Sequence, residues 1–261
     1  NVIEDSQAKL YIACQRGAGD SKRPLMTMVT LNLVNIFVSW WTSGVDAFGI
    51  PNPSPMNMGV SGIAVGTLCA YATGATLTIF WLISGTSGVQ LKAKRLRPHW
   101  HTMRRLIRVG IPNLVESIGM WAGNFLVLLF VGWLALDGLM GVHVIAIRVE
   151  AFSFLPGFSM GMAAATLAGQ YLGAGSTARA RTAIIRCTLI GAGIMGLMGV
   201  AFILFPHWII GRFTAQPAHL ELVPRLLVIC GIVQIPFGIA LVIRSALRGA
   251  GDVTFVMWIT W

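Results

Sequence analysis

The sequence predicts an all-α membrane protein, a polytopic helical bundle made of two like-oriented halves. Hydrophobic residues make up 56% of the 261 residues and charged residues only 11%, against roughly a quarter charged in a soluble domain. A chain of this composition cannot cover its surface with polar groups, so lipid must be part of its solvent. In addition, Arg16-Gly-Ala-Gly-Asp20 recurs letter for letter at residues 248–252. An even number of membrane crossings separates the two copies, which places both at matching corners of parallel repeats.

Six stretches are apolar over the length of about 20 residues that a helix needs to cross the hydrocarbon core. Because backbone groups in lipid must bond within their own segment, each stretch is predicted to be a helix. A seventh helix begins after Asp252, and the polar residues Asn1–Lys9 are interpreted as the end of an earlier one. The six stretches run near residues 25–48, 59–84, 109–134, 141–171, 182–210 and 222–247.

The connections between these stretches alternate in charge. Residues 16–23 and 85–108 are rich in Lys and Arg, whereas residues 46–58 contain neither, and basic residues return at 179–186 and 244–248. The positive-inside rule makes the basic set cytoplasmic, so both copies of the repeat lie on that side. The net charge of +10 is therefore explained by topology, and we expect no nucleic-acid partner.

The basic connection 85–108 is the longest one and is the expected joint between the halves. We predict that residues 1–84 end an N-terminal half and that residues 109–261 form most of a C-terminal half. The connection sets topology and can touch anionic lipid head groups. His99 and His101 within it are too few and too closely spaced for a metal site, and we expect no metal.

Small residues at every fourth position indicate helices that pack closely against their neighbours. Pro112, Pro156 and Pro236 interrupt three of the predicted helices and are expected to bend them. The small-residue ladders are Gly62, Gly66, Ala70 and Gly74 on one stretch and Gly157, Gly161, Ala165, Gly169 and Gly173 on another.

Ionisable residues within the apolar stretches are costly and are therefore candidates for function. Glu116 lies one helical turn after Pro112. If it faces a cavity with few partners, it can exchange protons, ligate Na⁺ or pair with a cationic substrate; alternatively it binds a neighbouring Arg. Arg148 and Glu150 share the next stretch but lie about 200° apart around an ideal helix, so they cannot pair with each other.

Uncharged polar residues within the stretches form a second group of candidates. Asn35 and Gln234 can hydrogen-bond either a bound compound or another helix. We group them with Glu116, Arg148 and Glu150 as candidate residues for substrate or cation binding.

Several strings of the sequence resemble the multidrug and toxic compound extrusion (MATE) family. The end of that family's eighth helix is similar to residues 155–175, Leu-Pro-Gly-Phe-Ser-Met-Gly-Met-Ala-Ala-Ala-Thr-Leu-Ala-Gly-Gln-Tyr-Leu-Gly-Ala-Gly. The repeated Arg-Gly-Ala-Gly-Asp resembles the ends of its fourth and tenth helices. Val109-Gly-Ile-Pro112 resembles the start of its seventh helix, and Asn32-Leu-Val-Asn35 fits its fifth. The resemblance covers the end of helix four, helices five to ten and the start of helix eleven, out of twelve.

This resemblance implies two six-helix lobes, related as parallel repeats, around a central cavity. It implies a secondary active antiporter that exports small organic, often cationic, compounds in exchange for H⁺ or Na⁺. We then expect no cofactor other than the coupling ion, a monomer in contact with the lipid bilayer and its small organic substrate, and a multi-pass position in the plasma membrane, the inner membrane of a bacterium.

Two alternatives stay open beside the antiporter. Related folds flip lipid-linked carriers, and a net basic cavity containing Arg148 favours that function, whereas a net acidic cavity favours cation export. A membrane enzyme or a passive channel is the third possibility. The sequence contains no His-Glu-x-x-His, Gly-x-Ser-x-Gly or Gly-Lys-Ser/Thr string, which argues against an enzyme and against an ATP site on this chain.

Overall fold

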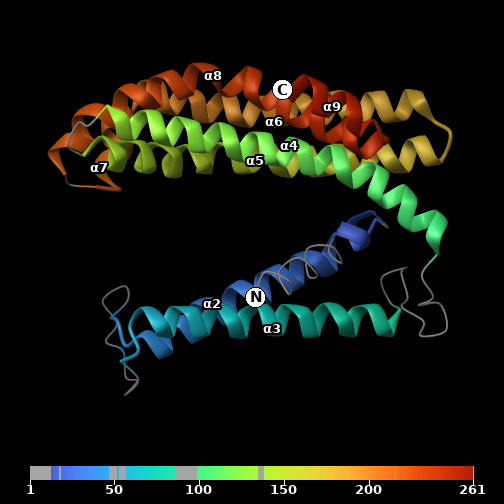
Figure 1. Ribbon diagram of the computed structural model, residues 1–261, viewed down its shortest axis with the longest axis horizontal. Coiled ribbons are helices and arrows are strands. Elements are labelled where there is room, and N and C mark those ends of the chain that lie inside the picture. The colour runs from blue at the N-terminus through green and yellow to red at the C-terminus, as the bar shows by residue number, and fades with distance from the viewer. Residues whose placement is uncertain are drawn as a thin grey trace. The chain divides into compact units, whose positions relative to one another are not determined.

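In the computed structural model, all regular secondary structure among the described residues is helical (Figure 1). The described residues are 13–17, 19–46, 52, 57–85, 99–134, 138–214 and 216–260. The predicted placement of Asn1–Lys9 therefore lies outside them, as does most of the basic connection. The chain divides into two units, Asn1–Pro98 and His99–Trp261.

The first unit contains a pair of helices, α2 (Lys22–Ser43) and α3 (Val60–Ser84), which pack along each other. The buried face of α3 includes the predicted ladder of small residues. A Cβ atom on Gly62 would lie 2.6 Å from the Thr42 carbonyl carbon, and the Thr42 hydroxyl donates to the Gly62 carbonyl oxygen at 2.8 Å. The ladder thus allows the backbones to touch.

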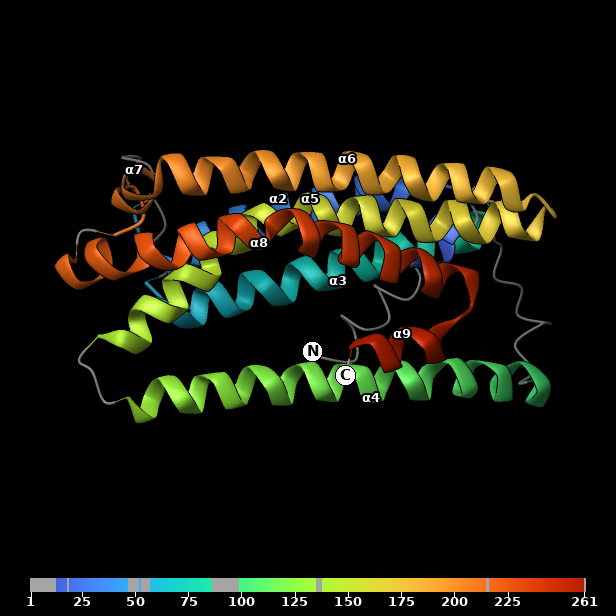
Figure 2. The same ribbon diagram turned by 90° about the horizontal axis from the view of Figure 1, so that it is seen from above.

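The second unit is built around three long helices that pack on one another. They are α5 (Leu139–Gly173), α6 (Thr177–Leu204) and α8 (Pro217–Ala250) (Figures 1 and 2). Two clusters of buried apolar side chains lie between them, one around Val149 and Leu227 and the other around Ala164 and Val242. Pro156 and Pro236 lie inside α5 and α8, which continue through them.

The ladder on α5 is the surface on which α8 packs. A Cβ atom on Gly161 would lie 2.7 Å from the Ser245 hydroxyl, and one on Gly249 would lie 2.5 Å from the Cα atom of Ala165. Gly173, at the end of the ladder, has no heavy atom within 4 Å of such a Cβ atom. Close packing therefore explains the ladder up to its last turn.

Three further helices complete the second unit. The long helix α4 (Trp100–Trp133) lies beside the short helix α9 (Val253–Thr260) (Figure 2). The third, α7 (Pro206–Gly211), is a short helix between α6 and α8. Because α9 follows α8 after a tight turn, α4, α8 and α9 come together at that end of the unit.

Two predicted boundaries were wrong. Residues 100–108, expected to belong to the basic connection, are the first turns of α4; their basic residues are arginines, which are good helix formers and whose long side chains can reach out to water. The predicted stretch 182–210 is two helices, because Pro206 starts α7 and the preceding Phe205 leaves the helical region at φ −126° and ψ 38°.

The two copies of the repeated string have the same local geometry. Gly19 and Gly251 have φ of 89° and 95°, a left-handed conformation that glycine adopts without strain. Their N–H groups donate to the carbonyl oxygens of Arg16 and Arg248 at 2.9 and 3.0 Å. In both copies the following Asp accepts a hydrogen bond from the first turn of the next helix. Each copy is thus a corner that ends one helix and starts another.

Six helices of the described chain are long and apolar enough to cross a membrane, namely α2, α3, α4, α5, α6 and α8. Four of them clearly exceed the length of about 20 residues that a perpendicular crossing needs; these are α4, α5, α6 and α8, which belong to the second unit. The predicted fold class, an all-α polytopic membrane protein, is confirmed.

Candidate functional site

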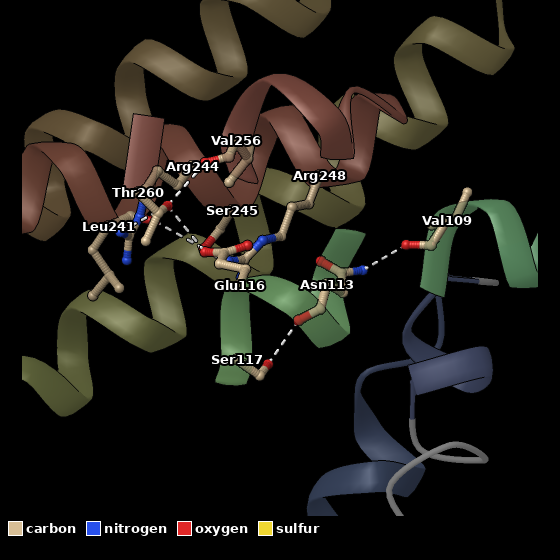
Figure 3. A network of polar contacts seen from close by, with 10 residues as sticks. All are labelled: Val109, Asn113, Glu116, Ser117, Leu241, Arg244, Ser245, Arg248, Val256 and Thr260. Carbon is tan, nitrogen blue, oxygen red and sulfur yellow. Dashed lines mark hydrogen bonds and ion pairs between the residues drawn. The ribbon is translucent and has the colours of Figure 1, made fainter. Parts of the chain in front are cut away.

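Two groups of polar side chains lie within the second unit. The Glu116 cluster joins Glu116 of α4 with Arg244 and Arg248 of α8 and Thr260 of α9 (Figure 3). The Glu150 cluster joins Glu150 of α5 with two residues of α8, Cys230 and Gln234. Each cluster connects helices that are distant in the sequence.

The Glu116 cluster is centred on one carboxylate oxygen. The side chain of Glu116 is 2% exposed, and its Oε1 atom forms an ion pair with the Arg248 guanidinium. The Thr260 hydroxyl lies 3.1 Å from the same oxygen, and Arg244 Nη1 donates to that hydroxyl at 3.4 Å. Arg244 and Arg248 are four residues apart and therefore lie on one face of α8.

Two polar side chains next to Glu116 hydrogen-bond to the backbone of α4. The Asn113 amide donates to the Val109 carbonyl at 3.3 Å, and the Ser117 hydroxyl donates to the Asn113 carbonyl at 2.8 Å (Figure 3). Pro112 lies in the same turn and has no N–H of its own to donate. The helix nevertheless continues through Pro112, and Glu116 lies on its buried face.

The second carboxylate oxygen of Glu116, Oε2, is buried and has no hydrogen-bond partner among the described residues. Arg244 Nε is likewise buried and has no hydrogen-bond partner among these residues. An unpaired buried polar atom is costly. The cluster therefore has an unused acceptor and an unused donor beside a charge pair that is already neutralised.

Of the interpretations of Glu116 that the sequence left open, the geometry matches the pairing with a neighbouring Arg. It does not match the alternative of a carboxylate with few partners, because Arg248 at the end of α8 and Thr260 of α9 both contact Glu116. A salt-bridged carboxylate at low dielectric has its charge balanced by a fixed neighbour. A direct part for Glu116 in substrate or cation binding stays a prediction.

The Glu150 cluster lies between α5 and α8. Gln234 is 1% exposed, and its Nε2 atom donates to Glu150 Oε1 at 3.5 Å. The Cys230 thiol lies beside Glu150. Cys230 and Gln234 are one turn apart on α8, so both face α5 at the level of Glu150.

The Glu150 cluster differs from the Glu116 cluster in its charge. No ion pair involves Glu150 within the part of the chain that the structure describes. Gln234 Oε1 is buried and has no hydrogen-bond partner there. A half-buried carboxylate next to an unpaired amide oxygen can hold a proton or offer oxygen ligands to a hard cation such as Na⁺.

Close helix packing fixes Gln234 in place. A Cβ atom on Gly199 of α6 would lie 2.5 Å from the Gly231 carbonyl oxygen and 3.1 Å from the Gln234 Cβ atom. A Cβ atom on Gly231 would in turn lie 2.7 Å from the Gly199 carbonyl oxygen. The amide is thus positioned by backbone contact between α6 and α8.

The remaining candidates, Arg148 and Asn35, have other surroundings. Arg148 is exposed on α5 and forms no ion pair with Glu150, as the helical geometry predicted. Asn35 belongs to the first unit, where its amide donates to the Thr67 hydroxyl of α3 at 3.4 Å. Among the four candidates of the second unit, the structure brings Glu150 and Gln234 into contact.

Sequence reasoning missed four residues of the two clusters: Cys230, Arg244, Arg248 and Thr260. Arg248 was interpreted only as part of a cytoplasmic corner. A signal was available, since Arg244 and Arg248 are four residues apart next to an apolar stretch and need an acidic partner if buried. Thr260 gave no signal. Among the described residues, no three His, Cys, Asp or Glu side chains could hold a metal ion together.

Comparison with known proteins identifies related sequences. A family model described as MatE matches residues 112–261. A probable multidrug resistance protein NorM of Thermotoga maritima is 30% identical over 254 residues, which is 97% of this chain and 53% of that protein. The multidrug resistance protein NorM of Burkholderia vietnamiensis is 31% identical over 217 residues, 81% of this chain and 45% of that protein. The chain spans about half the length of the curated relatives it matches.

Solved structures share the fold. One is described as the outward-facing conformation of a multidrug resistance MATE family transporter of the MOP superfamily. It matches with a TM-score of 0.81 at 18% identity, over 93% of this chain and 52% of that chain. A crystal structure of a MATE point mutant matches over the same shares with a TM-score of 0.80, also at 18% identity.

Proposed function

Because this chain belongs to the MatE family of multidrug and toxic compound extrusion (MATE) transporters, we propose that the full-length protein is a secondary active antiporter. It exports small organic, often cationic, compounds in exchange for H⁺ or Na⁺ by alternating access. Family members are transporters rather than enzymes. The names of the relatives, which describe multidrug resistance, support an organic cargo.

The proposed coupling between ion and cargo depends on the Glu150 cluster. Its carboxylate has an amide and a thiol as partners but no paired cation among the described residues. An intramembrane carboxylate of this kind is costly unless a proton, a cation or a cationic cargo shares the site. Glu150 is therefore the residue at which ion and cargo exclude each other.

Exchange then follows from differential binding. Protonation of Glu150, or Na⁺ bound between Glu150 and Gln234 Oε1, removes the negative charge that a cationic cargo needs. Each ligand favours a different conformation of the protein, and a ligand shifts the equilibrium only by its difference in affinity for the two states. The Glu116 cluster, whose carboxylate is already paired with Arg248, links α4 with α8 and α9.

The proposal also includes the oligomeric state of the protein, its membrane and its source of energy. The protein acts as a monomer in the plasma membrane, which is the inner membrane of a bacterium, and uses no cofactor besides its coupling ion. Its energy comes from the ion gradient. The family assignment supports a multi-pass membrane protein, and the basic connections support its orientation.

The experiment that tests the function is dye efflux from proteoliposomes containing the full-length protein. A proton gradient and a sodium gradient are imposed separately, and the gradient that drives efflux identifies the coupling ion. We expect the Glu150→Gln variant to insert normally and to lose gradient-driven efflux. Glu221→Gln is the matched control, because Glu221 is 72% exposed at the start of α8, and it should transport like the wild type. Normal coupled efflux by Glu150→Gln would remove Glu150 from the mechanism, and absence of efflux under both gradients would contradict the antiporter.

A further inference from the structure

A pocket of about 430 Å³ lies between the end of α5 and the start of α6 and shares no lining residue with either polar cluster. Its polar wall contains Arg179, Arg186 and the hydroxyl groups of Tyr171 and Thr182, and its apolar wall includes Leu167 and Ile190. The pocket therefore combines two guanidinium groups with a hydrocarbon surface.

Helical spacing explains why these side chains share one surface. Residues 179, 182, 186 and 190 follow one another at intervals of three or four and so lie on one face of α6. At 1.5 Å per residue, Arg179 and Arg186 are about 10 Å apart along the helix, and Ile190 lies about 6 Å beyond Arg186. Arg181 lies on another side of α6 and does not line the pocket, although all three arginines are exposed.

The charge of the pocket is uncompensated. Neither Arg179 nor Arg186 has an ion pair or a hydrogen bond within the described part of the chain, and no carboxylate lines the pocket. The Thr182 hydroxyl donates to the Ala178 carbonyl at 3.0 Å, so its proton is already used. The two guanidinium groups are thus the strong donors, and they would repel a cationic cargo and attract an anion.

The depth of the pocket in the membrane selects the kind of anion. It begins at the turn between α5 and α6, one of the basic connections that the positive-inside rule places at the cytoplasmic surface. From there it extends along two membrane-crossing helices. A ligand that fits must place a negative charge at the head-group level and hydrocarbon below it.

We propose that this pocket binds an anionic phospholipid of the cytoplasmic leaflet. The phosphate lies between Arg179 and Arg186 and accepts hydrogen bonds from both, and an acyl chain lies over Leu167 and Ile190. Basic pockets between transmembrane helices bind anionic head groups in this way. The site stands apart from the Glu150 cluster and needs no assumption about the cargo.

The test measures phospholipids that remain bound to the purified full-length protein, by native mass spectrometry after exchange into equimolar phosphatidylglycerol and phosphatidylcholine. We expect the wild type to retain phosphatidylglycerol preferentially. Each Arg near a membrane surface contributes about 1 kcal/mol, which is about a fivefold preference. The Arg179→Ala/Arg186→Ala variant should therefore lose about 25-fold in that preference, and Arg179→Lys/Arg186→Lys should recover part of it.

Arg181→Ala is the matched control, because it removes the same charge from the same helix outside the pocket, and it should leave the preference unchanged. Circular dichroism and size-exclusion chromatography establish that each variant is folded. Equal loss in Arg181→Ala would overturn the proposal, since the preference would then reflect overall charge. Displacement of phosphatidylglycerol by millimolar inorganic phosphate would overturn it as well, because the pocket would then bind a soluble anion.

Discussion

Glu116 of α4 and Arg248 of α8, 132 residues apart in the sequence, form an ion pair in which the carboxylate is 2% exposed and the guanidinium side chain 37%. Arg248 is the first residue of the repeated Arg-Gly-Ala-Gly-Asp string. The corner that the repeat forms therefore has two tasks: Gly251 and Asp252 end α8 and start α9, while Arg248 reaches α4. Loss of the pair would remove the ionic contact between α4 and α8 and leave α4 packed on α9 and α5.

Removal of the Arg248 charge should destabilise the protein more than removal of both charges. Arg248→Met leaves Glu116 as a buried unpaired carboxylate, and we expect a loss of about 2–4 kcal/mol in the free energy of unfolding. Adding Glu116→Met should restore most of it, because two apolar side chains of similar size need no partner. Reversible unfolding in mixed micelles measures the three values.

The matched control is the exposed pair of Glu221 and Arg225, whose side chains are 72% and 75% exposed. Because water screens both charges, Arg225→Met should change the free energy of unfolding by less than about 1 kcal/mol. An equal loss in Arg225→Met and Arg248→Met would show that the Glu116 pair does not stabilise the fold.

Two glycines of α6 should respond in opposite ways to the same substitution. Gly199→Ala places a methyl group against the Gly231 carbonyl and Gln234, and overpacking of this kind costs about 1–3 kcal/mol. It should also lower coupled efflux, because it displaces Gln234 from Glu150. Gly193→Ala meets no atom within 4 Å and should be neutral or stabilising by up to about 1 kcal/mol. Melting temperatures in detergent, together with efflux rates, test this contrast.

The corner glycines should resist substitution for a different reason. Gly19 and Gly251 have positive φ, and an L-residue in the left-handed region costs about 1–2 kcal/mol. Gly19→Ala and Gly251→Ala should each lower the free energy of unfolding by that amount, although open space surrounds Gly251. A neutral effect at both positions would mean that the two corners do not need this conformation.

The repeat also predicts a shared topology. In a background without native cysteines, Asp20→Cys and Asp252→Cys should both react with a membrane-impermeant maleimide only from the cytoplasmic side. Gly138→Cys, at the other end of the second unit, should react only from the opposite side. Labelling of residues 20 and 252 from opposite compartments would exclude the parallel repeat.

Much of the fold was determined by the sequence alone. Six apolar stretches and alternating loop charges predicted the crossing helices, because lipid leaves an apolar segment no other hydrogen-bonded structure. The repeated string predicted two matching corners, and the glycine ladders predicted close packing. The predicted helix boundaries were less accurate where charge and helix propensity point to different structures. In residues 100–108 the arginines suggested a loop, but Arg is also a good helix former.

The pairing of polar side chains was decided only by the tertiary structure. Helical geometry predicted that Arg148 and Glu150 do not meet, since both lie on one helix. It could not predict that Glu150 meets Gln234, or that Glu116 meets Arg248 and Thr260, because those contacts depend on how separate helices rotate about their own axes and at what height they pack. Backbone contacts at Gly199, Gly231 and Gly249 set the rotation and height of α8 against α6 and α5. The spacing of apolar residues cannot predict this rotation when a helix is apolar on every face.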